Sequence, residues 1–270
     1  MLAIAELARS TYYYHAKSDQ DKSSELVQLK QQVKVLFAQH KGCYGYRRIT
    51  LLLRQMGMLV NKKRIQRLMV EQGLRAVIRR RRRYSSYQGE QGRIAANVLA
   101  RQFDSPQPNE KWVTDVTEFK VGEEKLYLSP LMDLYNREII SYTLKRRPTY
   151  DLVDEMINQA LVQLPEHASP LIHSDQGWHY QHYTYQNNLR QRGITQSMSR
   201  KGNCLDNAVI ENFFGTLKCE MFYTEKFTSI EQLEQRIHEY IHYYNHERIH
   251  TKLKGLPPVQ YRLQSSNTTS

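Results

Sequence analysis

The chain has 270 residues and a net charge of +12, with 40% hydrophobic and 24% charged residues. This length allows one large domain or two modest ones, and the composition excludes a disordered or fibrous protein. Long uncharged apolar runs are missing, which argues against a membrane span, and the first residues do not resemble a signal peptide. Three cysteines without a Cys-x-x-Cys pair give no disulfide framework. We therefore expect a cytoplasmic protein.

The positive charge is concentrated in the N-terminal part of the chain. Residues 1–104 hold 21 Lys and Arg against 7 Asp and Glu, whereas residues 105–270 hold 18 against 20. Such an asymmetry indicates a polyanionic partner, and nucleic acid is favoured over acidic lipid because no membrane-type amphipathic helix accompanies the charge. The location that follows is the cytoplasm, in association with the nucleoid.

Two short helices are predicted after a longer helix over residues 24–40. Apolar residues at helical spacing mark residues 46–56, Gly57 ends that helix, and Asn61 is placed to cap the next one, which Gly73 closes. This is a helix-turn-helix pattern. The second helix turns four cations outward, and we expect these residues to contact DNA: Lys62, Lys63, Arg64 and Arg67.

A basic linker is predicted next. Five consecutive arginines precede a stretch rich in Gly, Ser and Gln, and they are expected to lie along DNA phosphates: Arg79, Arg80, Arg81, Arg82 and Arg83. At the other end of this region, residues 8–15 look like the end of a partial helix-turn-helix; a frayed helix explains them equally well.

From residue 109 the pattern changes to alternating strands and helices. Strands are predicted over 112–121, 125–134 and 138–145, followed by a helix over 152–164, a strand at 170–174, a helix near 182–192, a strand at 194–198 and further helices. The first three strands form an antiparallel meander, and the last two arrive through helical crossovers. The fold class is therefore α/β, with a mixed five-stranded sheet flanked by helices and preceded by an all-helical region.

Three acids stand out by their placement. Asp115 lies inside a strand, Asp175 ends an apolar strand, and Glu211 lies on a helix whose core face is formed by Val209, Ile210, Phe213 and Leu217. A charge within a sheet requires a cation. Three hard oxygen donors suit a pair of Mg²⁺ or Mn²⁺ ions, which would activate a water or 3′-hydroxyl for attack on a phosphodiester.

The helix of Glu211 is predicted to present two more polar residues on the same face as Glu211. The helical period places Asn207, Glu211 and Lys218 along one stripe. From this position, Lys218 is expected to hold a substrate phosphate.

The order of these residues resembles the DDE family of retroviral-integrase-like transposases. Asp115 and Asp175 are followed after 35 residues by Glu211, and Lys218 comes seven residues later. The surrounding segments at 112–117, 173–177 and 206–218 are similar to those of the IS-three family of bacterial insertion sequences, in particular to the product of the second reading frame. Segments 42–73 and 242–261, with Tyr-Asn-His-Glu-Arg and Leu-Pro-Pro, resemble other parts of that product.

The resemblance implies a fold, a reaction and partners. The core would be ribonuclease-H-like, with Asp115, Asp175 and Glu211 as catalytic and metal-binding residues. The enzyme would cut and join the ends of its own element with target DNA by a copy-out, paste-in route, as an oligomer on DNA. In this family an upstream frame adds terminal-repeat recognition and a leucine zipper, so the product of that frame is expected as a fusion or a partner.

Two other functions stay open at this point. A structure-specific nuclease of the same fold would share the acids without joining strands, and a DNA-binding regulator of transposition would not cut. Histidines 242, 246 and 250 recur every four residues, although packing or DNA contacts explain them better than a metal site. The expected domains are a partial helix-turn-helix remnant at 1–20, the helix-turn-helix region at 21–78, the basic linker at 79–108, the catalytic core at 109–265 and a disordered tail at 266–270.

Overall fold

A computed structural model describes residues 9–77, 94–166 and 168–266 of the chain. They fall into two units that divide between residues 78 and 79. The arginines of the predicted linker, residues 79–83, and the tail at 267–270 lie outside the described residues. Within the ranges given, no helix has both the length and the apolar character that crossing a membrane requires.

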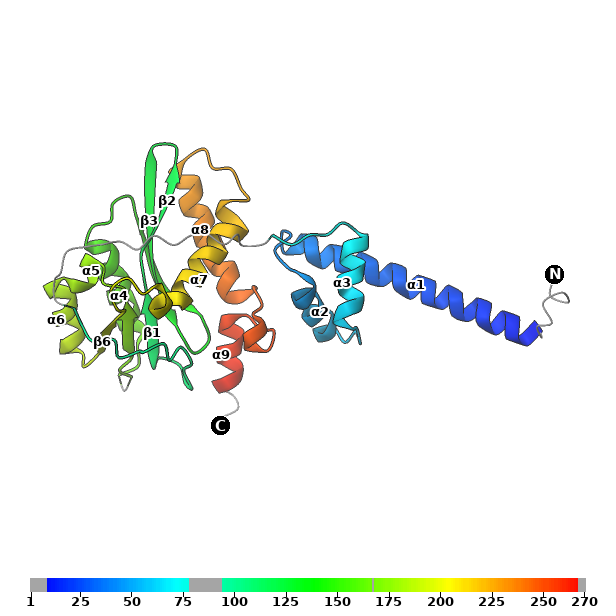
Figure 1. The fold of residues 1–270 in the computed structure, drawn as a ribbon, viewed down its shortest axis with the longest axis horizontal. Helices are drawn as coiled ribbons and strands as arrows, with labels where there is room; N and C mark the ends of the chain where they lie inside the picture. The colour runs from blue at the N-terminus through cyan, green and yellow to red at the C-terminus, as the bar shows by residue number, and fades with distance from the viewer. Residues whose placement is uncertain (1–8, 78–93, 167, 267–270) are drawn as a thin grey trace. The chain divides into compact units, whose positions relative to one another are not determined.

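The N-terminal unit contains helices α1 (Arg9–Gln39), α2 (Tyr46–Gln55) and α3 (Lys62–Glu71) (Figure 1). Residues 9–20, for which a separate remnant was expected, form the first turns of α1. The short helices follow the prediction. The Asn61 side chain accepts a hydrogen bond from Lys63 N at 2.9 Å, which caps α3, and Gly57 adopts a φ of +84° at the turn.

Apolar side chains hold α2 and α3 together. Each helix buries one stripe of residues, comprising Ile49 and Leu53 from α2 and Ile65, Leu68 and Met69 from α3. The turn between them is closed by Arg54, whose Nε and Nη2 donate to the carbonyl oxygen of Val60 at 3.1 and 3.0 Å. The cationic face of α3 is thereby left to solvent.

The core unit is built on one mixed sheet. Its strands are β1 (Lys111–Thr114), β2 (Thr117–Val121), β3 (Glu124–Asp133), β4 (Ile139–Lys145), β5 (Leu171–Ser174) and β6 (Thr195–Met198). Strands β1, β2 and β4 pair antiparallel with β3, whereas β1, β5 and β6 run parallel. This is the mixed α/β sheet that the sequence predicts.

The sheet has six strands where five were predicted, because the first one is interrupted. Thr114 pairs with Leu131 and Thr117 pairs with Leu128, so β1 and β2 keep one register against β3. The two residues between them face Ser129 and Pro130. Proline has no N–H to donate, which explains a break in the ladder at this place. Asp115 is the first residue of the break.

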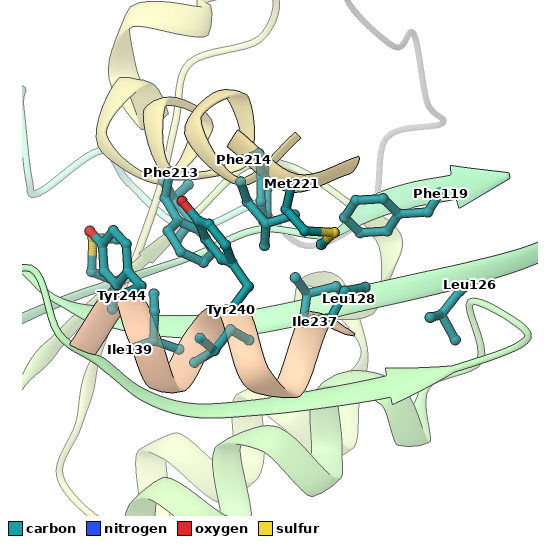
Figure 2. Close-up of a cluster of buried hydrophobic side chains, with 14 of the residues drawn as sticks. Phe119, Leu126, Leu128, Ile139, Phe213, Phe214, Met221, Ile237, Tyr240 and Tyr244 are labelled. Atoms are coloured by element: carbon teal, nitrogen blue, oxygen red, sulfur yellow. The ribbon is translucent and has the colours of Figure 1, made fainter. Parts of the chain in front are cut away.

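Helices cover both faces of the sheet (Figure 1). One face packs against α4 (Asp151–Gln163), α5 (Trp178–Gln181) and α6 (Tyr183–Gln191). The other packs against α7 (Ala208–Leu217), the π-helical turn η2 (Lys218–Phe222) and α8 (Ile230–His246). Figure 2 shows this second core, in which Phe213, Met221 and Tyr240 meet side chains of β2 and β3.

Three shorter elements complete the core unit. The turn η1 (Cys204–Asn207) leads into α7, and η3 (Thr251–Leu253) and α9 (Pro258–Ser266) follow α8. Helix α8 ends at His246, so His250 lies beyond it and does not share a helical stripe with the other two histidines.

Residues 94–104, which the sequence analysis assigned to the linker, pack against the core. Leu99 is buried in the cluster of α7 and α8, and Val98 N donates to Ser197 Oγ of β6 at 2.9 Å. This stretch lies along β6, which otherwise forms an edge of the sheet. Their partners in the core unit lie about a hundred residues away in sequence and therefore leave no local pattern.

Candidate active site

Asp115 and Asp175 lie side by side at one edge of the sheet. Strands β1 and β5 are parallel, and Val113 pairs with His173. Continuing this register by two residues sets Asp115 next to Asp175, just beyond the ends of both strands. Because side chains alternate along a strand, both carboxyl groups are on the face of Val113, which packs against α7. The sheet therefore brings together two acids that are 60 residues apart.

The surroundings of Asp115 disfavour the charged form of its carboxyl group. Its Oδ1 accepts a hydrogen bond from Val116 N at 2.7 Å. Burial raises the pKa of Asp115 well above its usual value, and the negative charges of Asp175 and Glu211 raise it further, while Lys218 opposes them. A cation bound here would relieve both causes.

Asp175 is fixed by the turn that follows it. Gly177 N donates to Asp175 Oδ1 at 2.8 Å. A Cβ atom at Gly177 would lie 2.8 Å from the same oxygen, so any side chain there would displace the carboxylate. Burial raises the pKa of Asp175, while the Gly177 N–H and His179 lower it.

Glu211 comes from the first turn of α7, on the same side of the sheet. Its negative charge is one of the causes that raise the pKa of Asp115. Ile210, Phe213 and Leu217 face the core as predicted, and Phe214 is buried with them.

Asn207, which was expected on the open stripe of α7, is buried instead, with an exposed fraction of 3%. Its Nδ2 donates to the carbonyl oxygen of Thr114 at 3.2 Å, immediately before Asp115. Its Oδ1 is buried without a hydrogen-bond partner among the described residues. Asn207 therefore connects the strand of Asp115 with the helix of Glu211.

Asp206 fixes the start of α7 from the other side. Its carboxylate is fully buried and accepts hydrogen bonds from three residues: Arg101 Nε at 2.7 Å, Asn97 Nδ2 at 2.9 Å, and Arg200 through N, Nε and Nη2 at 3.0 Å each. Hydrogen bonds from the two arginines hold the pKa of Asp206 well below its usual range. The acid therefore stays ionised and ties α7 to residues 97–101.

The buried His173 side chain connects residues 98 and 99 to the sheet through Ser197. Ser197 Oγ accepts hydrogen bonds from Val98 N and Leu99 N, so its own proton is directed to His173 Nδ1 at 2.9 Å. This arrangement favours a neutral His173 that accepts at Nδ1, while Nε2 is buried without a hydrogen-bond partner among the described residues. Burial lowers the pKa of His173 to about 4.

Lys218 lies beside β2 at the end of α7. Its Nζ donates to Thr117 Oγ1 at 2.7 Å and to the carbonyl oxygen of Glu118 at 2.9 Å, and it lies 5.0 Å from the centre of the Phe119 ring. These contacts place its charge close enough to the acids to lower the pKa of Asp115.

The fit to a metal ion can be judged from these groups. Hard carboxylate oxygens are the donors that Mg²⁺ and Mn²⁺ prefer, and burial raises the pKa of both Asp115 and Asp175, so a bound cation would favour their charged forms. In the described part of the chain, however, no group of three or more His, Cys, Asp or Glu side chains converges closely enough to hold a metal ion. Carboxylate oxygens fit these ions in kind, and two of the three expected carboxylates, Asp115 and Asp175, follow neighbouring parallel strands.

The predicted DNA-contacting residues of α3 are all exposed. Lys62, Lys63, Arg64 and Arg67 face solvent while Ile65 and Leu68 are buried. The five arginines at 79–83 lie outside the described residues.

Sequence reasoning missed the roles of Asp206 and His173. A histidine within the apolar strand at 170–174 is itself a signal for a satisfied core group. Arg200 lies only six residues before Asp206, whereas Arg101 precedes it by 105 residues and leaves no local signal.

Comparisons with known proteins give consistent matches along the chain. Models described as integrase core domain match residues 105–204 and 211–265, and one described as HTH-like domain matches residues 25–82. The putative transposase InsK for insertion sequence element IS150 of Escherichia coli K12 is 52% identical over 265 residues, which cover 98% of this chain and 93% of that protein.

Two further similarities differ in extent. The probable transposase for insertion sequence element IS1353 of Shigella flexneri is 37% identical, and the match covers 97% of this chain but 51% of that protein. The HTLV-2 integrase catalytic core domain, solved in complex with magnesium, is 20% identical with a TM-score of 0.41, covering 58% of this chain and 98% of that chain.

Proposed function

The chain belongs to the family of insertion-sequence transposases with an integrase core, enzymes that cut and join DNA, and we propose that Asp115, Asp175 and Glu211 are its catalytic carboxylates. The observation that supports this assignment is that Asp115 and Asp175 directly follow β1 and β5, two neighbouring strands that run parallel. Their mutual repulsion, increased by Glu211, makes the pair a site for divalent cations.

We further propose that the carboxylates hold Mg²⁺ or Mn²⁺, as a pair of ions. When bound, such ions make a water or 3′-hydroxyl more nucleophilic and stabilise the leaving oxygen. The chain contributes the fixed oxygens of Asp115 and Asp175, with Glu211 as the third carboxylate. Val116 N and Gly177 N orient the first two acids. Lys218, which lies at the same edge, contacts a substrate phosphate.

DNA is held by positive charge in both units. The exposed face of α3 and the arginines at 79–83 neutralise phosphates and bind duplex DNA with a strong dependence on salt. Helix α3 and these arginines thereby supply affinity, and the carboxylates of the core unit supply the chemistry.

The length of one relative bears on the partners of this chain. The Shigella transposase is about twice as long as the part that matches, which supports a second protein segment acting with this chain. We propose that the product of an upstream frame supplies it as a fusion or a partner, and that the active form is an oligomer on element ends and target DNA, in the cytoplasm with the nucleoid.

A cleavage assay tests the carboxylate assignment. Purified chain, with and without the upstream product, is incubated with labelled element ends and Mg²⁺. Asp175→Asn abolishes nicking and joining and leaves DNA binding at low salt nearly unchanged, because the neutral amide keeps the shape but loses the ion. Glu123→Gln, at a carboxylate side chain that is 98% exposed, is the matched control and retains activity.

Three results would reject parts of the proposal. Cleavage by Asp175→Asn would reject the assignment of the acids. Cleavage without strand joining would identify a structure-specific nuclease. Binding with no Mg²⁺-dependent nicking, with the upstream product present, would identify a regulator.

A further inference from the structure

An exposed tryptophan lies next to the candidate active site. The chain has two tryptophans. Trp112 is 1% exposed within the sheet, whereas Trp178 is 50% exposed. Tryptophan is enriched at contact surfaces because its ring is apolar and its N–H can reach water, so a half-exposed indole beside an active site is a candidate contact surface.

One face of the Trp178 ring is supported by the protein. The rings of Trp178 and His179 stack with their centres 3.9 Å apart and an interplanar angle of 28°. His179 is itself buried, and its Nε2 lies 2.9 Å from the carbonyl oxygen of Pro148. With one face on a fixed imidazole and half of its surface exposed, the indole offers its other face to solvent.

Trp178 is close to the carboxylates along the chain. It directly follows Gly177, whose N–H holds Asp175 Oδ1. Three residues span at most about 11 Å, a length that corresponds to roughly three nucleotides of a DNA strand at 3.4 Å each. A ligand on this ring therefore lies within a few nucleotides of a phosphate held at Asp175.

We propose that Trp178 is a stacking site for an unpaired nucleobase of the DNA strand held at Asp115 and Asp175. This inference rests on the proposed function of the carboxylates. A base inside a duplex is covered on both faces by its neighbours, so the indole takes a base that has left the stack, at a frayed end or an overhang. Stacking needs a planar ring and no particular base edge, so the site discriminates unpaired from paired DNA and not one sequence from another.

Intrinsic fluorescence tests this directly, because Trp178 is the exposed tryptophan of the two. The probes are a blunt DNA duplex and the same duplex with three unpaired nucleotides at either the 3′ or the 5′ end, added in EDTA so that no cleavage occurs. We expect the overhang duplex to quench the emission and the blunt duplex to leave it nearly unchanged. Trp178→Phe removes the quenching and keeps the affinity within about twofold.

Binding of the variants provides the second measurement. Trp178→Ala weakens binding of the overhang duplex by about 5- to 150-fold, the range that base stacking contributes, and leaves the blunt duplex unaffected. Tyr223→Ala, at an aromatic side chain that is 53% exposed on another element, is the matched control and changes neither.

The outcomes separate this site from the proposed function. Asp175→Asn keeps the quenching even though it does not cut. Three results would overturn the stacking site and leave the carboxylate assignment standing. They are equal quenching by the blunt and overhang duplexes, equal loss of affinity for both duplexes in Trp178→Ala, and shielding of Trp178 from solvent by the upstream product in the absence of DNA.

Discussion

The side-chain amide of Asn207 donates a hydrogen bond to the carbonyl oxygen of Thr114 at 3.2 Å. This contact joins the residue before Asp115 to the residue one helical turn before Glu211. It links β1 to the start of α7 inside the core, where Asn207 is buried. The spacing of two candidate catalytic acids thus depends on a side chain that carries no charge.

Replacing Asn207 should reduce catalysis more than DNA binding. Asn207→Ala removes the donor to Thr114 and lowers the stability by about 1–3 kcal/mol. We expect cleavage to fall at least tenfold and the Mg²⁺ concentration for half-maximal cleavage to rise, with affinity for DNA unchanged. Asn212→Ala, on the exposed face of the same helix, is the control. An unchanged Mg²⁺ dependence would show that Asn207 does not set the carboxylate geometry.

Neutralising Asp115 should stabilise the metal-free protein. An acid with a raised pKa in the folded chain costs stability once the pH exceeds its unfolded value, and the cost is complete above the folded value. Asp115→Asn removes this cost and should raise Tm in EDTA at pH 8.

Magnesium provides the second half of that test. Because an ion that binds only the folded chain stabilises it, Mg²⁺ should raise the Tm of the wild type and not that of Asp115→Asn. Equal shifts in both proteins would contradict the metal assignment without any reference to activity.

His173 should make the core unit sensitive to mild acid. Its pKa is about 4 in the folded protein, below the usual 6.5, so its stabilising contribution is present above pH 6.5 and is lost as the pH falls from 6.5 towards 4. The loss amounts to about 3 kcal/mol at most. His173→Gln should flatten the fall in Tm over this window. His179, whose pKa is also lowered, continues to contribute, so part of the acid sensitivity persists.

Breaking the buried ion pair between Glu220 and Arg248 should cost far more stability than breaking an exposed ion pair. Arg248 Nε and Nη2 each lie 2.7 Å from a Glu220 oxygen, and the two side chains are 4% and 8% exposed. Glu220→Gln leaves a buried guanidinium without its counterion and should cost about 3 kcal/mol or more, lowering Tm by roughly 6–12 °C.

A double variant and a surface control complete that experiment. Glu220→Gln with Arg248→Met should lose less than the sum of the single changes, as expected for groups in contact. Glu124→Gln, which breaks a pair with Arg146 in which both side chains are 53% exposed, should change stability by less than about 1 kcal/mol. Additive losses would show that the buried pair does not act as a unit.

The face of α3 should control the salt dependence of DNA binding. Changing Lys62, Lys63, Arg64 and Arg67 to Gln removes up to four phosphate contacts, each worth about 0.9 in the slope of log K against log salt. A filter-binding series from 50 to 300 mM salt measures this slope. Lys34→Gln, an exposed lysine on α1, is the control. An unchanged slope in the fourfold variant would move the DNA contacts away from α3.

Local patterns in the sequence determined much of this protein. The apolar stripes of α2 and α3, the Asn61 cap and the order of strands and helices follow from residues within one or two turns of each other, since side chains repeat every 3.6 residues in helices and every two in strands. The three acids stood out in the same way, by their neighbours and spacing.

Tertiary structure decided how those elements meet. Periodicity tells which face of a strand is buried but not which residue of another strand lies beside it, so the register that sets Asp115 next to Asp175 required the folded sheet. The hydrogen bonds from Asn207 to Thr114 and from Arg101 to Asp206 likewise join segments about a hundred residues apart. Hydrogen bonds of that kind form only when the chain has closed on itself, and for this reason no short window of sequence contains them.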